Sequence, residues 1–185
     1  MSVWLLYVIQ IGWYGHCIFT HIMSDIRKSD FWIMLIHHIS ALLLLYSALA
    51  TGYHRCGVLT LYCLDGCDIF LHLTKCVRLI ANVHYIPTVI AVGSYLSVVF
   101  SWIYFRIGLF LVKVLYTASF QGLHYGGWKN SDNWFYYNTL LLIIYALQLY
   151  WFYLILLSGY KYVRFGEKLD DQRDPTADAN DKKKN

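Results

Sequence analysis

Four ionisable side chains lie within long apolar stretches of this sequence, and their types suit acid–base or nucleophilic chemistry: His37, His38, Asp65 and Asp68. An ionisable residue inside a membrane span costs about 2.5–3.5 kcal/mol on insertion scales, so each one needs a reason to be there. The two aspartates are spaced i, i+3 and share a helix face, whereas the adjacent histidines point about 100° apart. An imidazole held by a carboxylate can act as a general base or a nucleophile. The other interpretation is a structural polar contact that joins two membrane helices.

Metal binding is another use of clustered histidines. The sequence has eight histidines but one HH pair and no HxxxH, so it lacks the repeated boxes that hold two irons in membrane hydroxylases and desaturases. Asp65, Asp68 and His72 share one helix face, with Cys76 a turn further, and these residue types can bind zinc. Because no CxxC spacing accompanies them, we expect no metal site.

The elements that would position these residues are apolar runs long enough to cross a bilayer. A hydrocarbon core of roughly 30 Å requires about 20 helical residues. Four such runs contain no Asp, Glu, Lys or Arg: 1–24, 31–54, 79–105 and 134–160. A fifth run, 56–76, contains the two aspartates. The stretch 107–120, which Lys113 interrupts, either extends the fourth helix or forms a re-entrant or interfacial piece. The sequence therefore predicts an all-α fold, a polytopic membrane helix bundle with about five transmembrane helices.

The composition also indicates a membrane protein. Of the 185 residues, 58% are hydrophobic, 18% aromatic and 14% charged. A net charge of +4 without a basic stripe on a polar face predicts no nucleic-acid partner. The five cysteines lie in apolar runs, where reduced Cys acts as a small hydrophobe, and we assign no disulfide. The Trp and Tyr residues near 134–137 and 150–153 are expected at the membrane interfaces.

The charged residues divide the chain into two parts. Of its 26 charged side chains, 13 follow Tyr160, so we predict one transmembrane domain over residues 1–160 and a disordered cytosolic tail over residues 161–185. With this tail in the cytosol, the basic residues at 27–28 and 75–78 also lie on the cytosolic side. The tail ends in KKKN, which resembles a dilysine retrieval signal of the endoplasmic reticulum but is also typical of a solvated tail.

This orientation places the histidines and the aspartates at overlapping depths. A helix that enters near Phe31 and rises about 1.5 Å per residue carries the adjacent histidines about 9–11 Å deep. A helix that returns near Lys75 carries Asp68 and Asp65 about 10 and 15 Å deep by the same rise. We therefore predict that the two pairs meet.

The segment 37–75 resembles, without a gap, the Lag motif of the ceramide synthases, which belong to the TLC-domain family. That motif pairs HH with a downstream RxG and then HDxxDxxLExxK. The positions that match it are His37, His38, Arg55, Gly57, Asp65, Asp68, Leu71 and Lys75. Segments 25–38, 100–116 and 147–156 are also similar to the family. The stretches YHRCG, FRIGLFLVKVLY and YWFY look closest to its stearoyl-preferring branch.

The resemblance implies N-acylation of a sphingoid base by a fatty acyl-CoA in the endoplasmic reticulum membrane, giving ceramide or dihydroceramide. One of His37 and His38 would attack the thioester or deprotonate the amine, with Asp65 and Asp68 orienting the imidazoles. Acyl-CoA is then a co-substrate, and no cofactor is expected. The other expected partners are the sphingoid base and membrane lipid, with a homo- or hetero-dimer left open.

Three cations are the substrate-binding residues we expect: Arg55, Lys75 and Arg106. Their positions equally suit structural roles, since Arg55 fits an interfacial charge and the other two fit helix-end cations. These positions leave the acyl-chain length open.

Two motif positions depart from the family pattern. The His that precedes the first Asp is Leu64 here, and the Glu is His72. The family core has six helices and five are predicted, so we expect the chain to be truncated at its N-terminus. The alternative function is a non-catalytic TLC protein that binds or senses lipid or helps membrane-protein handling. The departures favour this alternative, whereas the retained His and Asp pairs favour the enzyme.

Overall fold

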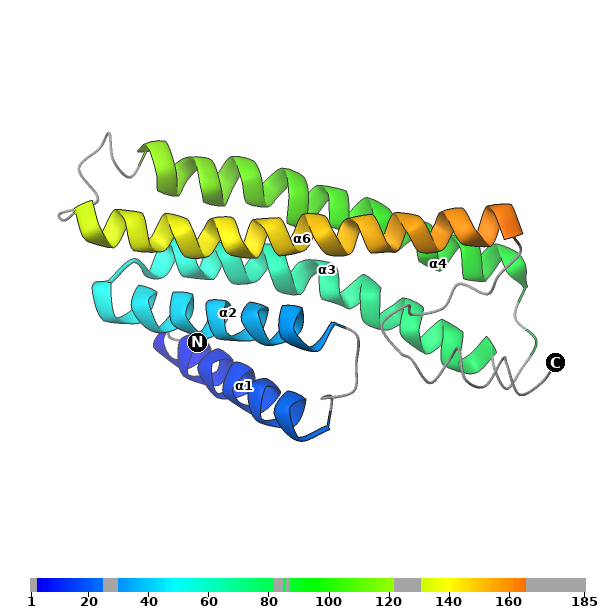
Figure 1. Cartoon of the computed structure of the whole chain (residues 1–185), viewed down its shortest axis with the longest axis horizontal. Helices are drawn as coiled ribbons and strands as arrows, with labels where there is room; N and C mark the ends of the chain where they lie inside the picture. The colour runs from blue at the N-terminus through cyan, green and yellow to red at the C-terminus, as the bar shows by residue number, and fades with distance from the viewer. Residues whose placement is uncertain (1–2, 25–29, 82–84, 86, 122–130, 166–185) are drawn as a thin grey trace. The chain divides into compact units, whose positions relative to one another are not determined.

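The computed structural model describes residues 3–24, 30–81, 85, 87–121 and 131–165, and all regular structure in these ranges is helical (Figure 1). The helices are α1 (Val3–Ser24), α2 (Phe31–Thr51), α3 (His54–Ala81), α4 (Thr88–Ser101), η1 (Trp102–Leu115), η2 (Thr117–Gln121) and α6 (Ser131–Phe165). The predicted all-α fold is confirmed.

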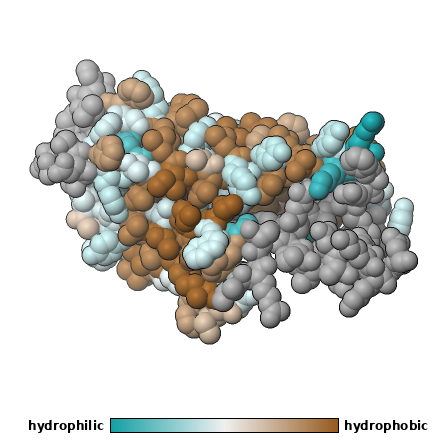
Figure 2. Space-filling view, viewed as in Figure 1, coloured by the Kyte–Doolittle hydropathy of each residue, from teal (hydrophilic) through white to brown (hydrophobic). Residues whose placement is uncertain are grey.

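Five helical segments of the described chain are long and apolar enough to cross a membrane: Val3–Ser24, Phe31–Thr51, His54–Ile80, Thr88–Phe120 and Trp134–Arg164. They match the predicted spans in order and confirm a multi-pass membrane protein. Large side chains on their outer faces are uncovered, among them Trp32 at 71% and Ile69 at 70% exposed. Figure 2 shows hydrophobic residues over much of the visible helical surface, as expected where helices face lipid.

Gly52 and Pro87 explain two helix boundaries that differ from the predicted ones. Gly52 follows α2 with a φ of +82°, a left-handed conformation that glycine adopts without steric cost, so α2 ends before its apolar run does. Pro87 precedes α4, and its carbonyl accepts a hydrogen bond from the N–H of Ile90 at 2.9 Å. Because proline has a fixed φ and no N–H, it suits a helix start, and the fourth span begins at Thr88 instead of residue 79.

The fourth span is longer than predicted. α4, η1 and η2 follow one another without a break, so the stretch 107–120 extends the fourth helix. η1 is a π-helix, and at its end the N–H of Tyr116 donates to the carbonyl of Leu111, five residues earlier. Such segments are uncommon and frequently lie at functional sites. Arg106 consequently lies inside the span and not at a helix end.

The chain divides into two compact units, one of residues 1–52 and 150–185 and the other of residues 53–149. In the first unit α1 packs on α2, and in the second α3 packs against α4 and η1. The core of the second unit includes fully buried side chains from α3, η1 and α6: Cys63, Phe110, Tyr137, Leu141 and Ile144.

Two aromatic residues expected at membrane interfaces are buried. Tyr137 is 2% exposed and its ring lies edge-on to Tyr53, with centroids 5.7 Å apart. Trp151 is 5% exposed. Both side chains therefore pack within the protein, as an amphipathic aromatic side chain can, and their position at a membrane interface stays a prediction.

Candidate active site

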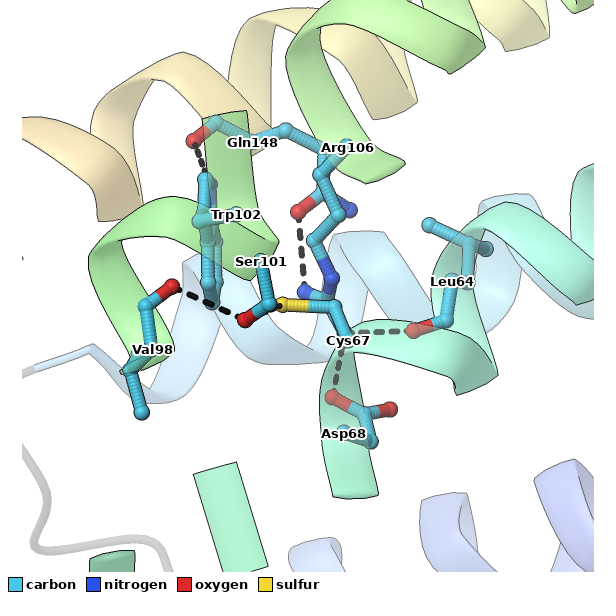
Figure 3. Close-up of polar contacts among 8 residues, drawn as sticks. All are labelled: Leu64, Cys67, Asp68, Val98, Ser101, Trp102, Arg106 and Gln148. Carbon is cyan, nitrogen blue, oxygen red and sulfur yellow. Dashed lines mark hydrogen bonds and ion pairs between the residues drawn. The ribbon is translucent and has the colours of Figure 1, made fainter. Parts of the chain in front are cut away.

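The buried guanidinium of Arg106 links three helices of the second unit. Its Nη2 forms an ion pair with Oδ1 of Asp68 on α3. The same nitrogen donates to the carbonyl of Leu64, one turn earlier on α3, at 3.1 Å. Nη1 donates to Oε1 of Gln148 on α6 at 2.9 Å. Figure 3 shows Arg106 reaching from η1 toward these partners.

Trp102 and Gln148 hold the guanidinium in place. The ring of Trp102, on the preceding turn of η1, has its centroid 4.3 Å from Cζ of Arg106, within the range of a cation–π contact. The indole N–H of Trp102 donates to the carbonyl of Gln148 at 3.1 Å. Both residues are almost completely buried. Trp102 and Arg106 of η1 therefore both donate hydrogen bonds to Gln148 of α6.

Gly66 lies where η1 packs closely on α3. A Cβ at this position would lie 3.0 Å from Cε1 of Phe105, whose ring also contacts Tyr62 edge-on at 5.8 Å. The next residue, Cys67, has its thiol 3.6 Å from the hydroxyl of Ser101. The small size of Gly66 thus permits the helix approach that accompanies the ion pair.

The ion pair between Asp68 and Arg106 is a costly arrangement. Removing two charges from water costs several kcal/mol per ion, and their attraction repays this only when geometry and additional hydrogen bonds are good. The side chain of Arg106 is 7% exposed and that of Asp68 is 38% exposed. The carboxylate is thus held on one side and can still face another group.

His37 and His38 lie on α2 in the first unit, in different surroundings. His37 is buried, and its ring lies edge-on to Trp151 of α6 with centroids 5.0 Å apart. The half-buried His38 has its ring centroid 6.0 Å from those of both Tyr14 and His21 on α1. Among the described residues, no hydrogen-bond partner meets the buried Nδ1 of His38. A nitrogen in this condition suits proton transfer or nucleophilic attack.

Sequence reasoning did not single out His21 or Gln148. His21 is 5% exposed, its Nε2–H donates to the carbonyl of Phe31 at 3.0 Å, and its ring stacks on the Phe31 ring at 4.8 Å. It thereby joins the end of α1 to the start of α2. The available signal was the same for both residues, since each is a polar side chain in a run without Asp, Glu, Lys or Arg.

The predicted site residues fall into two groups. The histidine pair belongs to the first unit and the aspartate pair to the second, so the meeting of the two pairs stays a prediction. Within its own unit, Asp65 is half-buried on α3, one turn before Asp68. The structure brings Asp68 together with Arg106, a contact that the sequence did not predict.

The two other predicted substrate-binding cations lie toward opposite ends of α3. Arg55 is exposed in the first turn, whereas Lys75 is half-buried in the last third of the helix. Twenty residues separate them, which corresponds to about 30 Å along the helix. They are therefore too far apart to hold one charged group together.

The residues considered for zinc do not form a ligand set in the described part of the chain. There, no three His, Cys, Asp or Glu side chains are grouped so that they could hold a metal ion. His72, a member of the set considered from the sequence, is exposed on α3.

Comparison with known proteins identifies the family. A family model described as the TLC domain matches residues 1–157. The chain is 34% identical to ceramide synthase 1 of Homo sapiens, over 79% of this chain and 42% of that protein. It is 28% identical to ASC1-like protein 3 of Oryza sativa subsp. japonica, over 84% of this chain and 54% of that protein. It is 25% identical to ceramide synthase LOH2 of Arabidopsis thaliana, over 84% of this chain and 52% of that protein.

The chain spans about half the length of these relatives. No solved structure matches it. The family match nevertheless includes the first four apolar spans and the whole motif segment, and it ends at residue 157, within the fifth span. The chain therefore belongs to the TLC-domain family.

Proposed function

We propose that this chain catalyses the N-acylation of a sphingoid base by a fatty acyl-CoA. The observation that carries this function is Asp68, a motif carboxylate kept inside a membrane span by Arg106 with 38% of its side chain uncovered. Relatives named ceramide synthase support the same reaction, as does the motif spacing.

The reaction forms an amide bond and breaks a thioester. The amine nitrogen bonds to the thioester carbonyl carbon, the C–S bond breaks, the amine loses a proton, and CoA leaves as its thiol after taking up one proton. His37 or His38 accepts the amine proton, or first attacks the thioester to give an acyl-imidazole that the amine then displaces. Asp65 and Asp68 orient the imidazoles and stabilise the imidazolium. The buried Nδ1 of His38 supports that residue in the reacting role.

A common depth for these groups is part of the proposal, with Lys75 near the cytosolic surface although α3 continues six residues further, to Ala81. α2 begins at Phe31, so the two histidines lie about 9–11 Å along it. Lys75 lies about 10 Å along α3 from Asp68, and Arg55 lies about 20 Å from Asp68 in the other direction. With the C-terminus cytosolic, Lys75 is suited to meet the phosphates of acyl-CoA, and Arg55 is suited to a group at the opposite interface.

The proposed location is the endoplasmic reticulum membrane, with membrane lipid around the spans and the C-terminus in the cytosol. α6 runs to Phe165, five residues beyond the predicted domain end at 160. The rest of the predicted tail, 166–185, lies outside the described residues. A homo- or hetero-dimer remains open in this arrangement.

The function is tested by incubating the purified chain in lipid nanodiscs with sphinganine and a panel of acyl-CoAs, and measuring ceramides by mass spectrometry. We expect product with the wild-type chain and a loss of about 10²–10⁴-fold for His38→Ala, because a positioned base contributes that much. His16→Ala is the matched control, since His16 is an exposed histidine on α1 and should tolerate the change. A folded wild-type chain that makes no ceramide with any acyl-CoA would contradict the function.

A second function is favoured by one observation. Leu64 is 3% exposed and provides no imidazole where the family motif has one. A TLC protein that binds lipid without turnover would retain sphinganine in the same nanodiscs and yield no ceramide. Saturable sphinganine binding together with absent product would therefore support the non-catalytic function.

A further inference from the structure

We propose that Arg106 is a positioning residue that orients Asp68 through their ion pair, and that Gln148 and Trp102 hold Arg106 for this purpose. Since Asp68 belongs to the proposed catalytic set, the role in turnover rests on the proposed function. The sequence predicted Arg106 as a substrate-binding cation, and the contacts of its side chain assign it this other role.

The contacts of Arg106 determine where its charge lies. Nη2 faces two acceptors one turn apart on α3, the carboxylate of Asp68 and the carbonyl of Leu64, and Nη1 faces Gln148 on α6. The face of the guanidinium lies over Trp102. A planar group held at both ends and on one face has little freedom to rotate. The orientation of Asp68 is then set by three helices instead of by its own rotamer preference.

Arg106 supplies a counter-charge to Asp68 within a membrane span. An isolated carboxylate in a low-dielectric environment takes up a proton, because desolvation disfavours the charged form. Arginine stays protonated in proteins and so supplies a permanent counter-charge. Asp65, one turn earlier on α3, is a carboxyl and offers Asp68 no counter-charge. Arg106 is the cation that the structure places directly against Asp68.

The burial of Arg106 distinguishes positioning from substrate binding. Arg106 is 6% exposed, and both of its terminal nitrogens donate to groups of the chain. A phosphate of CoA would have to displace these partners to reach it. The uncovered part of Asp68 is, by contrast, open to a reacting group. Substrate therefore meets the carboxylate, and Arg106 acts through it.

The first test measures the protonation of Asp68 without any turnover. Dicyclohexylcarbodiimide, an apolar reagent, adds a protonated carboxyl across its N=C bond, the oxygen going to carbon and the proton to nitrogen, and the adduct rearranges to a stable N-acylurea. The chain in nanodiscs is treated at pH 7, and tandem mass spectrometry separates modified Asp68 from modified Asp65. We expect little modification of Asp68 in the wild type and at least about tenfold more in Arg106→Gln, because a carboxyl without its counter-charge in a low-dielectric environment takes up a proton.

Two variants keep this test decisive if Arg106→Gln does not fold. Arg106→Lys retains the charge and should leave Asp68 unmodified, whereas Gln148→Met releases Nη1 and should increase the modification. Lys113→Gln is the matched control, since Lys113 is an exposed cation on the same helix and its removal should change nothing. Equal modification of Asp68 in the wild type, Gln148→Met and any folded Arg106→Gln protein would overturn the assignment.

The second test separates positioning from binding by kinetics. We expect Arg106→Lys to lower kcat by about 10²-fold, the typical cost of a displaced catalytic group, with the KM for acyl-CoA little changed. A raised KM with unchanged kcat would show that Arg106 binds substrate and would refute the positioning role. If the wild type makes no ceramide, the proposed function fails, while the carbodiimide result still decides whether Arg106 holds Asp68 in an ion pair.

Discussion

At the scale of single residues, the ionisable side chains differ in how their burial is compensated. Asp68 has a full counter-charge in Arg106, whereas His38 has aromatic neighbours and a buried Nδ1 that no described group satisfies. A buried polar atom without a partner costs about 1–3 kcal/mol, which is a reason to look for a function at His38. The paired carboxylate suits orienting and stabilising charge, and the imidazole suits the bond-making step.

Leu64→His is a substitution that tests the departure from the family motif. Leu64 is 3% exposed and its carbonyl already accepts from Arg106, so the side chain can change while the backbone contact remains. We expect turnover to rise, because the change supplies an imidazole next to Asp65, even though burying a polar ring costs about 1–3 kcal/mol of stability. Ceramide production per folded molecule is the measurement.

Leu61→His provides the control for that substitution. Leu61 is 4% exposed on the same helix, about one turn earlier, so the polar ring should cost similar stability there without a gain in turnover. Equal turnover in both variants, neither above the wild type, would show that the missing motif histidine does not limit the reaction.

At the scale of elements, the packing of α3 and η1 decides the geometry of the ion pair. Gly66 and Phe105 are in close contact, and each is near the ion pair in sequence, two residues before Asp68 and one before Arg106. The two charges therefore approach each other only as closely as this helix contact allows. The π-helical form of η1 determines which of its side chains point toward α3.

Gly66→Ala tests this dependence. The added Cβ would lie 3.0 Å from the Phe105 ring, so the ring or the helix must shift. Overpacking costs about 1–3 kcal/mol, and the better helix propensity of Ala returns about 1 kcal/mol, so the net loss of stability is about 0–2 kcal/mol. We expect turnover to fall by about tenfold or more, because small displacements of catalytic groups are costly. Thermal stability and kcat of the purified variant are the measurements.

Gly93→Ala is the matched control on α4. A Cβ at Gly93 meets nothing within 4 Å, so the higher helix propensity of Ala should raise the thermal stability without a loss of turnover. If Gly66→Ala retained full activity, the close approach of the two helices would not control the site.

At the scale of the whole molecule, the proposed function depends on how the spans are oriented in the membrane. In the topology we propose, all five apolar spans of the described residues cross the membrane, and this odd number of crossings puts Val3 and Phe165 on opposite sides. The Lys and Arg residues favour the cytosol for the C-terminal end. Acyl-CoA, a cytosolic polyanion, would then approach from the side nearer to Lys75.

Protease protection tests this orientation. An epitope placed after Lys184 should be removed when protease is added to sealed microsomes, because the proposed topology puts the C-terminus on their outer, cytosolic surface. Detergent-opened microsomes give the control for complete digestion. An epitope that survives in sealed vesicles and disappears only after detergent would reverse the topology and remove the depth argument for the His and Asp pairs.

The sequence alone determined the helical class, the five spans and the candidate histidines and aspartates. These features depend on local properties, namely the length of apolar runs and the cost of an ionisable group within them. The i, i+3 spacing placed Asp65 and Asp68 on one helix face for the same reason. The sequence did not decide whether the stretch 107–120 extends the fourth helix or forms a re-entrant or interfacial piece, since Lys113 suits either the end or the middle of a helix.

Only the tertiary structure decided which side chains meet across helices. Asp68 and Arg106 are 38 residues apart, and their contact depends on how α3 and η1 are rotated and shifted along each other. The buried places of Gln148 and Trp151 likewise depend on which face of α6 turns inward. When nearly every position of a span is apolar, hydropathy does not indicate how the helix is rotated about its axis. The partner of a buried charge is therefore known only once the helices are packed.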